Sequence, residues 1–146
     1  MKTEIKKTES SEFERLAEIY FLEFSKPPYN ENWTKEKAIE KLKILSKYCE
    51  IYSIFYQDQL VGFFAANPNK FLPGTVIEGE EFVVDFNFQN LGIGTFVLDW
   101  ACKEYSKRGY IRFILLSSRN SKQFNFYTKR NYLESETDVL LERCLK

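Results

Sequence analysis

The chain has 146 residues, a formal net charge of zero and no histidine. This length suits one domain, residues 1–146, with a substantial core, and zero charge provides no general attraction to nucleic acid or an anionic membrane surface. Without histidine, Ser-His and Cys-His nucleophilic pairs and most zinc sites are excluded. Acid–base chemistry must therefore come from carboxylates, tyrosine, lysine, cysteine or water.

The N-terminus is charged, unlike a secretory signal, and no apolar run approaches the ~20 residues that a membrane span needs. Three widely separated cysteines, Cys49, Cys102 and Cys144, suit a reducing compartment better than a disulfide framework. We expect a cytoplasmic protein with no membrane or nucleic-acid partner. Cys102 is expected to be a buried structural thiol, and none of the three is assigned chemistry.

The first half of the chain predicts a strand, two helices and a hairpin. A short strand over residues 3–7 precedes a helix with a capping box at Ser11 and Glu14. After a proline-broken loop, Thr34 is expected to cap a second helix. Residues 50–67 then read as two strands joined by a hairpin near residues 57–59.

The second half alternates strands and helices. Residues 77–85 predict a strand, followed by a helix that Gly109 ends. A buried strand over residues 111–118, a short helix with Asn131 as its left-handed C-cap, and a strand over residues 139–145 complete the chain. The order β-α-α-β-β-β-α-β-α-β predicts an α/β fold, with a mixed central sheet of about six to seven strands flanked by about four helices.

Two glycines, Gly92 and Gly94, stand one residue apart between a predicted strand and helix. Glycine here either relieves crowding or lets a phosphate approach the amides of the helix's first turn. The third glycine of a dinucleotide-binding fingerprint would fall at Val97, and no Gly-Lys-Ser/Thr phosphate loop is present. A pyrophosphate could bind here, but in neither of those two ways.

Two separate segments resemble one protein family. The hexapeptide Gln89-Asn90-Leu91-Gly92-Ile93-Gly94 resembles the Gln/Arg-x-x-Gly-x-Gly/Ala loop of the GNAT superfamily of N-acetyltransferases. Val84 and Asp85 before it match the family's Val-Asp-Pro approach, with Phe86 in place of the proline. Residues 120–132 resemble the family's Asn-x-x-Ala-x-x-Phe-Tyr-x-Lys-x-Gly-Phe segment, with departures at Gln123, Asn131 and Tyr132. The spacing of the two motifs and the order of elements fit a GNAT-type fold over nearly the whole chain.

The resemblance implies acetyl-coenzyme A as cosubstrate and no metal. In the family, the loop amides hold the pyrophosphate, and the backbone of the preceding strand pairs with the pantetheine arm. The resemblance therefore places the cosubstrate on Phe82, Val83, Val84, Gln89, Asn90, Leu91, Gly92, Ile93, Gly94, Thr95, Asn120 and Tyr127.

The resemblance also implies an acid and a base. Tyr127 is the candidate general acid, since a phenol is protonated at neutral pH and can donate; the alternative is a tyrosine that only packs. The family often uses a carboxylate on the strand before the loop, acting through water. We favour Glu80, then Glu78, although an acidic solvated strand end remains the alternative. Strand alternation predicts Glu78 and Glu80 on the face of Phe82 and Val84, and Glu81 on the opposite face.

The loop between the first two helices lines the acceptor pocket in this family. It carries Tyr29, Asn30, Glu31 and Trp33, a mixture suited to a cationic amine, unless Trp33 merely fastens the second helix to the core. We expect transfer of acetyl directly from coenzyme A to a primary amine of a small molecule. A non-catalytic acyl-coenzyme A sensor and a peptide or protein N-acetyltransferase remain alternatives, and a homodimer remains open.

Overall fold

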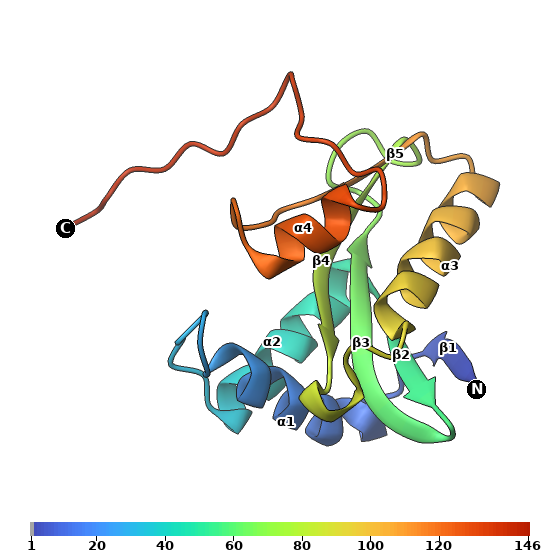
Figure 1. Cartoon of the computed structure of the whole chain (residues 1–146), viewed down its shortest axis with the longest axis vertical. Coiled ribbons are helices and arrows are strands. Elements are labelled where there is room, and N and C mark those ends of the chain that lie inside the picture. The colour runs from blue at the N-terminus through green and yellow to red at the C-terminus, as the bar shows by residue number, and fades with distance from the viewer. Residues whose placement is uncertain (1) are drawn as a thin grey trace. The chain divides into compact units, whose positions relative to one another are not determined.

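The computed structural model describes residues 2–146, which form two compact units, one ending at Leu115 and the other spanning Leu116–Lys146. The first unit contains a five-stranded sheet in the order β1-β2-β3-β4-β5 (Figure 1). The strands are β1 (Thr3–Lys7), β2 (Glu50–Tyr56), β3 (Gln59–Asn67), β4 (Val76–Val84) and β5 (Arg112–Leu115). The first four pair antiparallel, and β5 runs parallel to β4, so the sheet is mixed as predicted.

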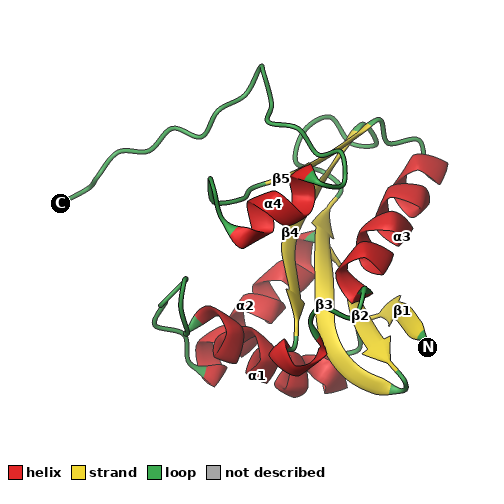
Figure 2. Ribbon diagram, in the orientation of Figure 1, coloured by secondary structure: helices red, strands yellow, loops and turns green. Residues whose placement is uncertain are grey.

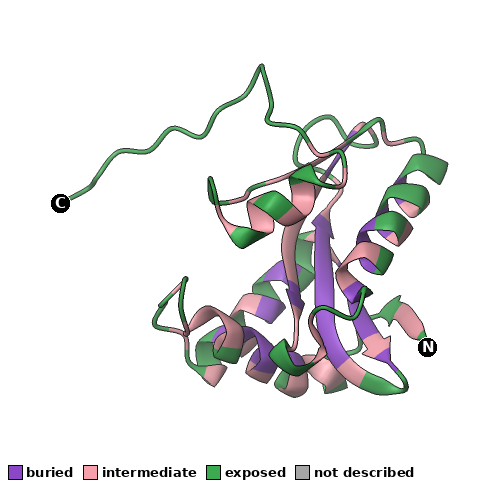
Figure 3. Ribbon diagram, in the orientation of Figure 1, coloured by how far each residue is buried: buried purple, intermediate pink, exposed green. Residues whose placement is uncertain are grey.

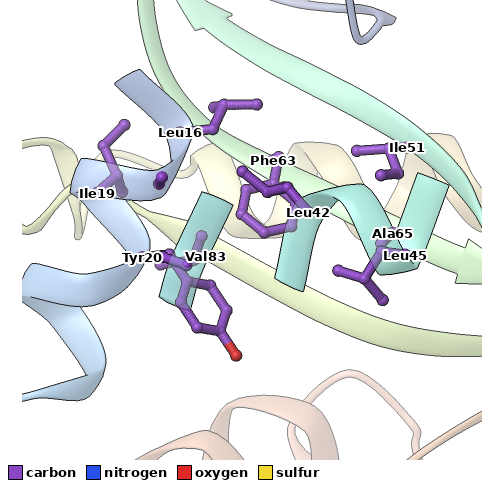
Figure 4. Packing of buried hydrophobic residues seen from close by; sticks show 11 residues of the cluster. Leu16, Ile19, Tyr20, Leu42, Leu45, Ile51, Phe63, Ala65 and Val83 are labelled. Atoms are coloured by element: carbon purple, nitrogen blue, oxygen red, sulfur yellow. The ribbon is translucent and has the colours of Figure 1, made fainter. Parts of the chain in front are cut away.

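Helices cover both faces of this sheet (Figure 2). The first face carries α1 (Phe13–Phe24) and α2 (Lys35–Tyr48), and the second carries α3 (Ile93–Lys107). Of the five strands, β2 and β3 are mostly buried, whereas β4 is mostly half-buried (Figure 3). Figure 4 shows the α1–α2 core, in which Leu16, Leu42 and Leu45 of the helices form one buried cluster with Phe63 and Val83 of the sheet. No helix in residues 2–146 has the length and apolar character needed to cross a bilayer.

Local sequence signals account for most boundaries of these elements. Thr34 caps α2, with its hydroxyl accepting from the amide of Lys37 at 3.1 Å. Gln57 and Asp58 adopt φ of +50° and +66° in the two-residue hairpin turn. Before α1, a 3₁₀ turn (Ser10–Glu12) intervenes, and the amide of Glu9 donates to the Glu12 carboxylate at 3.0 Å. The predicted capping box at residues 11 and 14 is therefore wrong by two residues.

An ion-pair cluster fastens the end of α3 to the start of β2. Glu50 accepts two hydrogen bonds from Arg108, at 2.9 and 2.7 Å, and one from the Tyr105 hydroxyl at 2.6 Å. Hydrogen bonding to Arg108 is the main cause that lowers the pKa of Glu50 to about 2, while burial opposes it. Glu50 is therefore ionised in the folded protein at all ordinary pH values.

The second unit contains α4 (Lys122–Thr128), which the Ser121 hydroxyl caps by accepting from the amide of Phe124 at 3.0 Å. Asn131 has a φ of +69°, and the amide of Tyr132 donates to the carbonyl of Tyr127, which confirms the predicted left-handed helix end. Residues 116–146 contain no strand.

The α/β class and the four α-helices are confirmed, but the strand predicted over residues 139–145 is wrong, and the sheet has five strands rather than about six to seven. Strand propensity creates a strand only where a neighbouring backbone completes the ladder. This segment has no such ladder, and its large apolar side chains remain exposed: Val139, Leu140, Leu141 and Leu145.

Candidate active site

The turn before α3 is shaped by left-handed residues. A 3₁₀ turn (Phe86–Phe88) follows β4, and the Gln89 side-chain amide then donates to the carbonyl of Val84 at 2.9 Å. Asn90 and Gly92 have φ of +64° and +83°. A Cβ on Gly92 would meet no atom within 4 Å, so glycine is needed there for backbone conformation rather than to avoid a clash within the protein.

The same turn presents an open helix N-terminus. Gly92 is the N-cap of the 15-residue helix α3 and offers no side chain to accept from the first amides. Those amides and the helix dipole favour an anion, and the space around Gly92 lets one approach the backbone. The loop residues singled out from the sequence, 89–95, therefore come together in a turn whose chemistry fits a pyrophosphate.

One edge of β4 continues beyond its partner. β5 pairs with β4 only from Val76 to Gly79. Within residues 2–115, the backbone from Glu80 to Val84 has no strand partner on that edge, and this stretch includes Phe82, Val83 and Val84. An unpaired strand edge can hydrogen-bond an extended amide-containing ligand as an additional strand would.

A β-bulge in β4 rearranges its carboxylates. Ala65 pairs with Glu81 and Ala66 pairs with Gly79, so Glu80 is an extra residue without a partner on β3. Beyond the bulge, Phe82 and Val84 face the α3 core. The charges of Glu78, Glu80 and Glu81 all act on Tyr48 and Cys49 at the end of α2, which places the three carboxylates on the α1–α2 side.

The predicted alternation was therefore wrong for Glu78 and Glu80, which do not share the face of Phe82 and Val84. The extra residue shifts the phase of the strand by one, so that Glu80 and Glu81 lie on the same side. All three glutamates are brought together as a result.

Glu78 and Glu80 lie close enough for the charge of one to act on the other. Burial is the main cause that raises the pKa of Glu78, and the charge of Glu80 raises it further. Lys70, in the loop between β3 and β4, lies 3.5 Å from Glu78 Oε1 and opposes this shift. A raised pKa makes the ionised Glu78 carboxylate a stronger base.

Glu81 belongs to a network that the sequence pattern did not reveal. Its side chain is 17% exposed, accepts from the Tyr20 hydroxyl at 3.2 Å and lies 3.6 Å from the Lys41 ammonium. Burial raises the pKa of Glu81, and Lys41 counteracts that effect. Tyr20 lies on the buried face of α1, and the local sequence gives no sign of its partner, which is 61 positions away.

The loop between α1 and α2 contains the predicted acceptor residues. The Trp33 ring packs edge-on against Tyr20 with centroids 4.8 Å apart, while its Nε1 donates to Glu31 Oε1 at 3.0 Å. Tyr29 packs against Phe24 at 4.7 Å. Trp33 therefore packs against the core through Tyr20, and its contact with an acceptor stays a prediction. Since Tyr20 contacts both Trp33 and Glu81, it also links this loop to the carboxylates of β4.

Asn30, at a φ of +51°, and Glu31 are exposed, so both are accessible to an acceptor. In the second unit, Tyr127 is half-buried on α4, with ring centroids 5.4 Å from Phe126 and 5.5 Å from Tyr132. Asn120 has a φ of +58° and precedes the cap of α4.

The cysteines differ in environment. Cys49 is half-buried, and burial, followed by the charges of Glu80 and Glu78, raises the pKa of its thiol to about 12. This thiol is protonated at neutral pH and is a poor nucleophile. Cys102 is exposed, so the prediction that it is buried was wrong. The buried face of α3 carries Ala101 and Tyr105 instead.

Comparison with known proteins identifies the family. The model of the Acetyltransferase (GNAT) family matches residues 13–132, and the chain belongs to this family. No curated protein matches the chain significantly.

Similar solved structures share the fold. One is described as a possible acetyltransferase from Clostridium difficile 630, with a TM-score of 0.81, 12% identity, and 99% of each chain covered. Another is the PaiA N-acetyltransferase from Thermoplasma acidophilum in complex with coenzyme A, with a TM-score of 0.70, 22% identity, and 94% of each chain covered. A third is the aminoglycoside acetyltransferase meta-AAC0020 from an uncultured soil metagenomic sample in complex with sisomicin, with a TM-score of 0.69, 14% identity, and 99% and 97% coverage.

Proposed function

We propose that the protein transfers an acetyl group directly from acetyl-coenzyme A to a primary amine of a small molecule. One observation carries this proposal: an open, glycine-capped helix N-terminus directly follows a strand that bears the neighbouring carboxylates Glu78 and Glu80. The family of the chain supports acetyl transfer. Two similar structures, described as a coenzyme A complex and an aminoglycoside complex, are consistent with the cosubstrate and with an amine acceptor.

In this proposal, the cosubstrate is held by the chain's backbone. The amides of residues 89–95 bind the pyrophosphate, and the unpaired edge of β4 at Phe82, Val83 and Val84 hydrogen-bonds the pantetheine arm. Asn120 and Tyr127 complete the binding set by their match to the family motif. The acceptor amine approaches over Tyr29, Asn30, Glu31 and Trp33, where aromatic rings and an exposed carboxylate suit a cation.

The Glu78–Glu80 pair acts as the general base. A lysine-like ammonium has a pKa of about 10.4, so it must lose a proton before it can attack. The pair accepts that proton, directly or through a water, and the neutral amine then attacks the thioester carbonyl. Tyr127 donates a proton to the departing thiolate, whose pKa is about 8.5 in water.

A transfer assay with acetyl-coenzyme A and a panel of small amines tests the proposal. Reagents that detect the thiol of released coenzyme A would also react with the exposed Cys102 and Cys144. Consumption of acetyl-coenzyme A should therefore be followed by chromatography. We expect acetyl-coenzyme A consumption to depend on the amine and to yield one acetylated amine per coenzyme A. Binding of acetyl-coenzyme A without transfer to any amine would instead favour a sensor, and transfer only to peptide N-termini would favour the third alternative.

A further inference from the structure

A lysine of the chain itself lies next to the proposed base. Lys70 is in the β3–β4 loop, and its Nζ is 3.5 Å from Oε1 of Glu78. The Lys70 side chain is 46% exposed, whereas that of Glu78 is 16% exposed. The ammonium therefore reaches from solvent toward a mostly buried carboxylate.

The contact between the two groups is loose. Oε1 of Glu78 is buried, and its 3.5 Å distance to Nζ of Lys70 is longer than an ordinary N–H···O bond. Lys70 therefore acts on Glu78 mainly through its charge. Phe71 and Leu72 next to Lys70 are exposed, so no core packing of these neighbours holds this part of the loop. An amine in this position can leave the carboxylate once it has given up its proton.

We propose that Lys70 is an internal acceptor, so that in the absence of a small amine the protein acetylates its own Lys70. This inference rests on the proposed function. Glu78 accepts a proton from the Lys70 ammonium, and the neutral amine forms an N–C bond with the thioester carbonyl of acetyl-coenzyme A. The C–S bond breaks, the thiolate is protonated, and the products are an amide at Lys70 and free coenzyme A. No other reactant is required.

Acetylation would also change the site. The modified Lys70 carries no charge, so Glu78 would lose its only nearby cation among the ion pairs of residues 2–115. The Glu78–Glu80 pair would then bear its negative charge without compensation, which favours an external cationic amine. Lys70 thus occupies the place of the external ammonium, and its acetylation would vacate that place.

Lys41 provides a matched control. Its Nζ lies 3.6 Å from Glu81, and its side chain is 33% exposed, so its distance to a carboxylate and its accessibility are close to those of Lys70. Glu81, however, already accepts a hydrogen bond from Tyr20 and is not part of the proposed base pair. If the reaction needs the base and not merely a neighbouring carboxylate, Lys70 and not Lys41 becomes acetylated.

The test incubates the full chain with acetyl-coenzyme A alone and follows intact mass and peptide maps over time. We expect one acetyl group per chain at Lys70, released coenzyme A in equal amount, no such gain in Lys70→Arg, and an unchanged rate in Lys41→Arg. Glu78→Gln should slow the modification at least about tenfold, since general bases contribute ~10²–10⁴-fold.

Modification of Lys70 no faster than that of Lys41 or of exposed Lys47 would overturn the inference, as would an unchanged rate in Glu78→Gln. The same preparation is assayed with the amine panel. Transfer to a small amine without acetylation of Lys70 refutes the internal acceptor and leaves the proposed function standing. Coenzyme A binding with neither reaction refutes both.

Discussion

Replacing Gly92 with valine should separate folding from cosubstrate binding. Gly92 has a φ of +83°, and a Cβ there would meet nothing within 4 Å, so the penalty is that of the left-handed backbone alone. That penalty is roughly 1–2 kcal/mol for an L-residue. For a chain of this size it should lower the melting temperature by roughly 4–8 °C and leave the protein folded at room temperature.

Binding should respond much more strongly than folding. A ligand at 100 times its Kd stabilises the folded state by about 2.7 kcal/mol. Coenzyme A should therefore raise the melting temperature of the wild-type protein by roughly 10 °C. In Gly92→Val, the valine side chain occupies the space through which the pyrophosphate approaches the amides, and we expect this increase to disappear. Thermal unfolding with and without coenzyme A measures both quantities.

Gly109 is the matched control. It has a φ of +93° and equally open surroundings, but it lies at the other end of α3, about 22 Å away for a 15-residue helix. Gly109→Val should cost a similar stability and keep the full increase with coenzyme A. A folded Gly92→Val protein that retains the increase, or its equal loss in both variants, would refute the assignment of this turn to the pyrophosphate.

The remaining predictions concern the acid, the base and the ion-pair cluster. Tyr127→Phe should lower turnover by ~10²–10⁴-fold with little change in coenzyme A affinity, whereas wild-type turnover would make Tyr127 a packing residue. Glu80→Gln and Glu78→Gln should each reduce turnover most near neutral pH, with the defect shrinking as pH approaches the pKa of the acceptor amine; pH–rate profiles that match wild type would remove the pair from the mechanism. In the folded protein Arg108 is the main cause that lowers the pKa of Glu50 to about 2, whereas the pKa in the unfolded chain is about 4.3. The ionised Glu50 therefore stabilises the folded state fully above about pH 4.3, and this stabilisation is lost as the pH falls toward 2. Glu50 is 23% exposed, so solvent screening limits this contribution to about 1–2 kcal/mol. Between pH 5 and 2 the free energy of unfolding, measured in urea, should therefore fall by that much less in Glu50→Gln than in the wild-type protein. An identical fall in both proteins would contradict the role of the ion-pair cluster.

Features encoded within a few residues could be predicted from the sequence. The cap at Thr34, the left-handed end at Asn131 and the helix stop at Gly109 each depend on local backbone chemistry, and the structure has all three. The turn around Gly92 belongs to the same class. Gly92 can be recognised in the sequence because the left-handed conformation that it adopts is a local property.

Features set by distant partners could not be predicted. The side of β4 on which Glu78 and Glu80 lie depends on a register shift against Ala65 and Ala66, and neither strand alone encodes it. The same holds for Tyr20, whose partner Glu81 is supplied by another element. The apolar residues 139–145 show the converse, because a strand-like pattern without a paired backbone is not a strand.

The bulge also allows β4 to lose one residue without a change in its packing. Ala65 and Ala66 pair with Glu81 and Gly79, so removing residue 80 outright would restore continuous alternation and leave every other side chain of β4 on its present side. Glu80 is therefore an insertion within the packing pattern, and it occupies no position that the core requires. A one-codon deletion at this point should yield a chain that folds and lacks the central carboxylate. A strand can therefore gain a carboxylate by insertion of one residue, without replacing any side chain of the core.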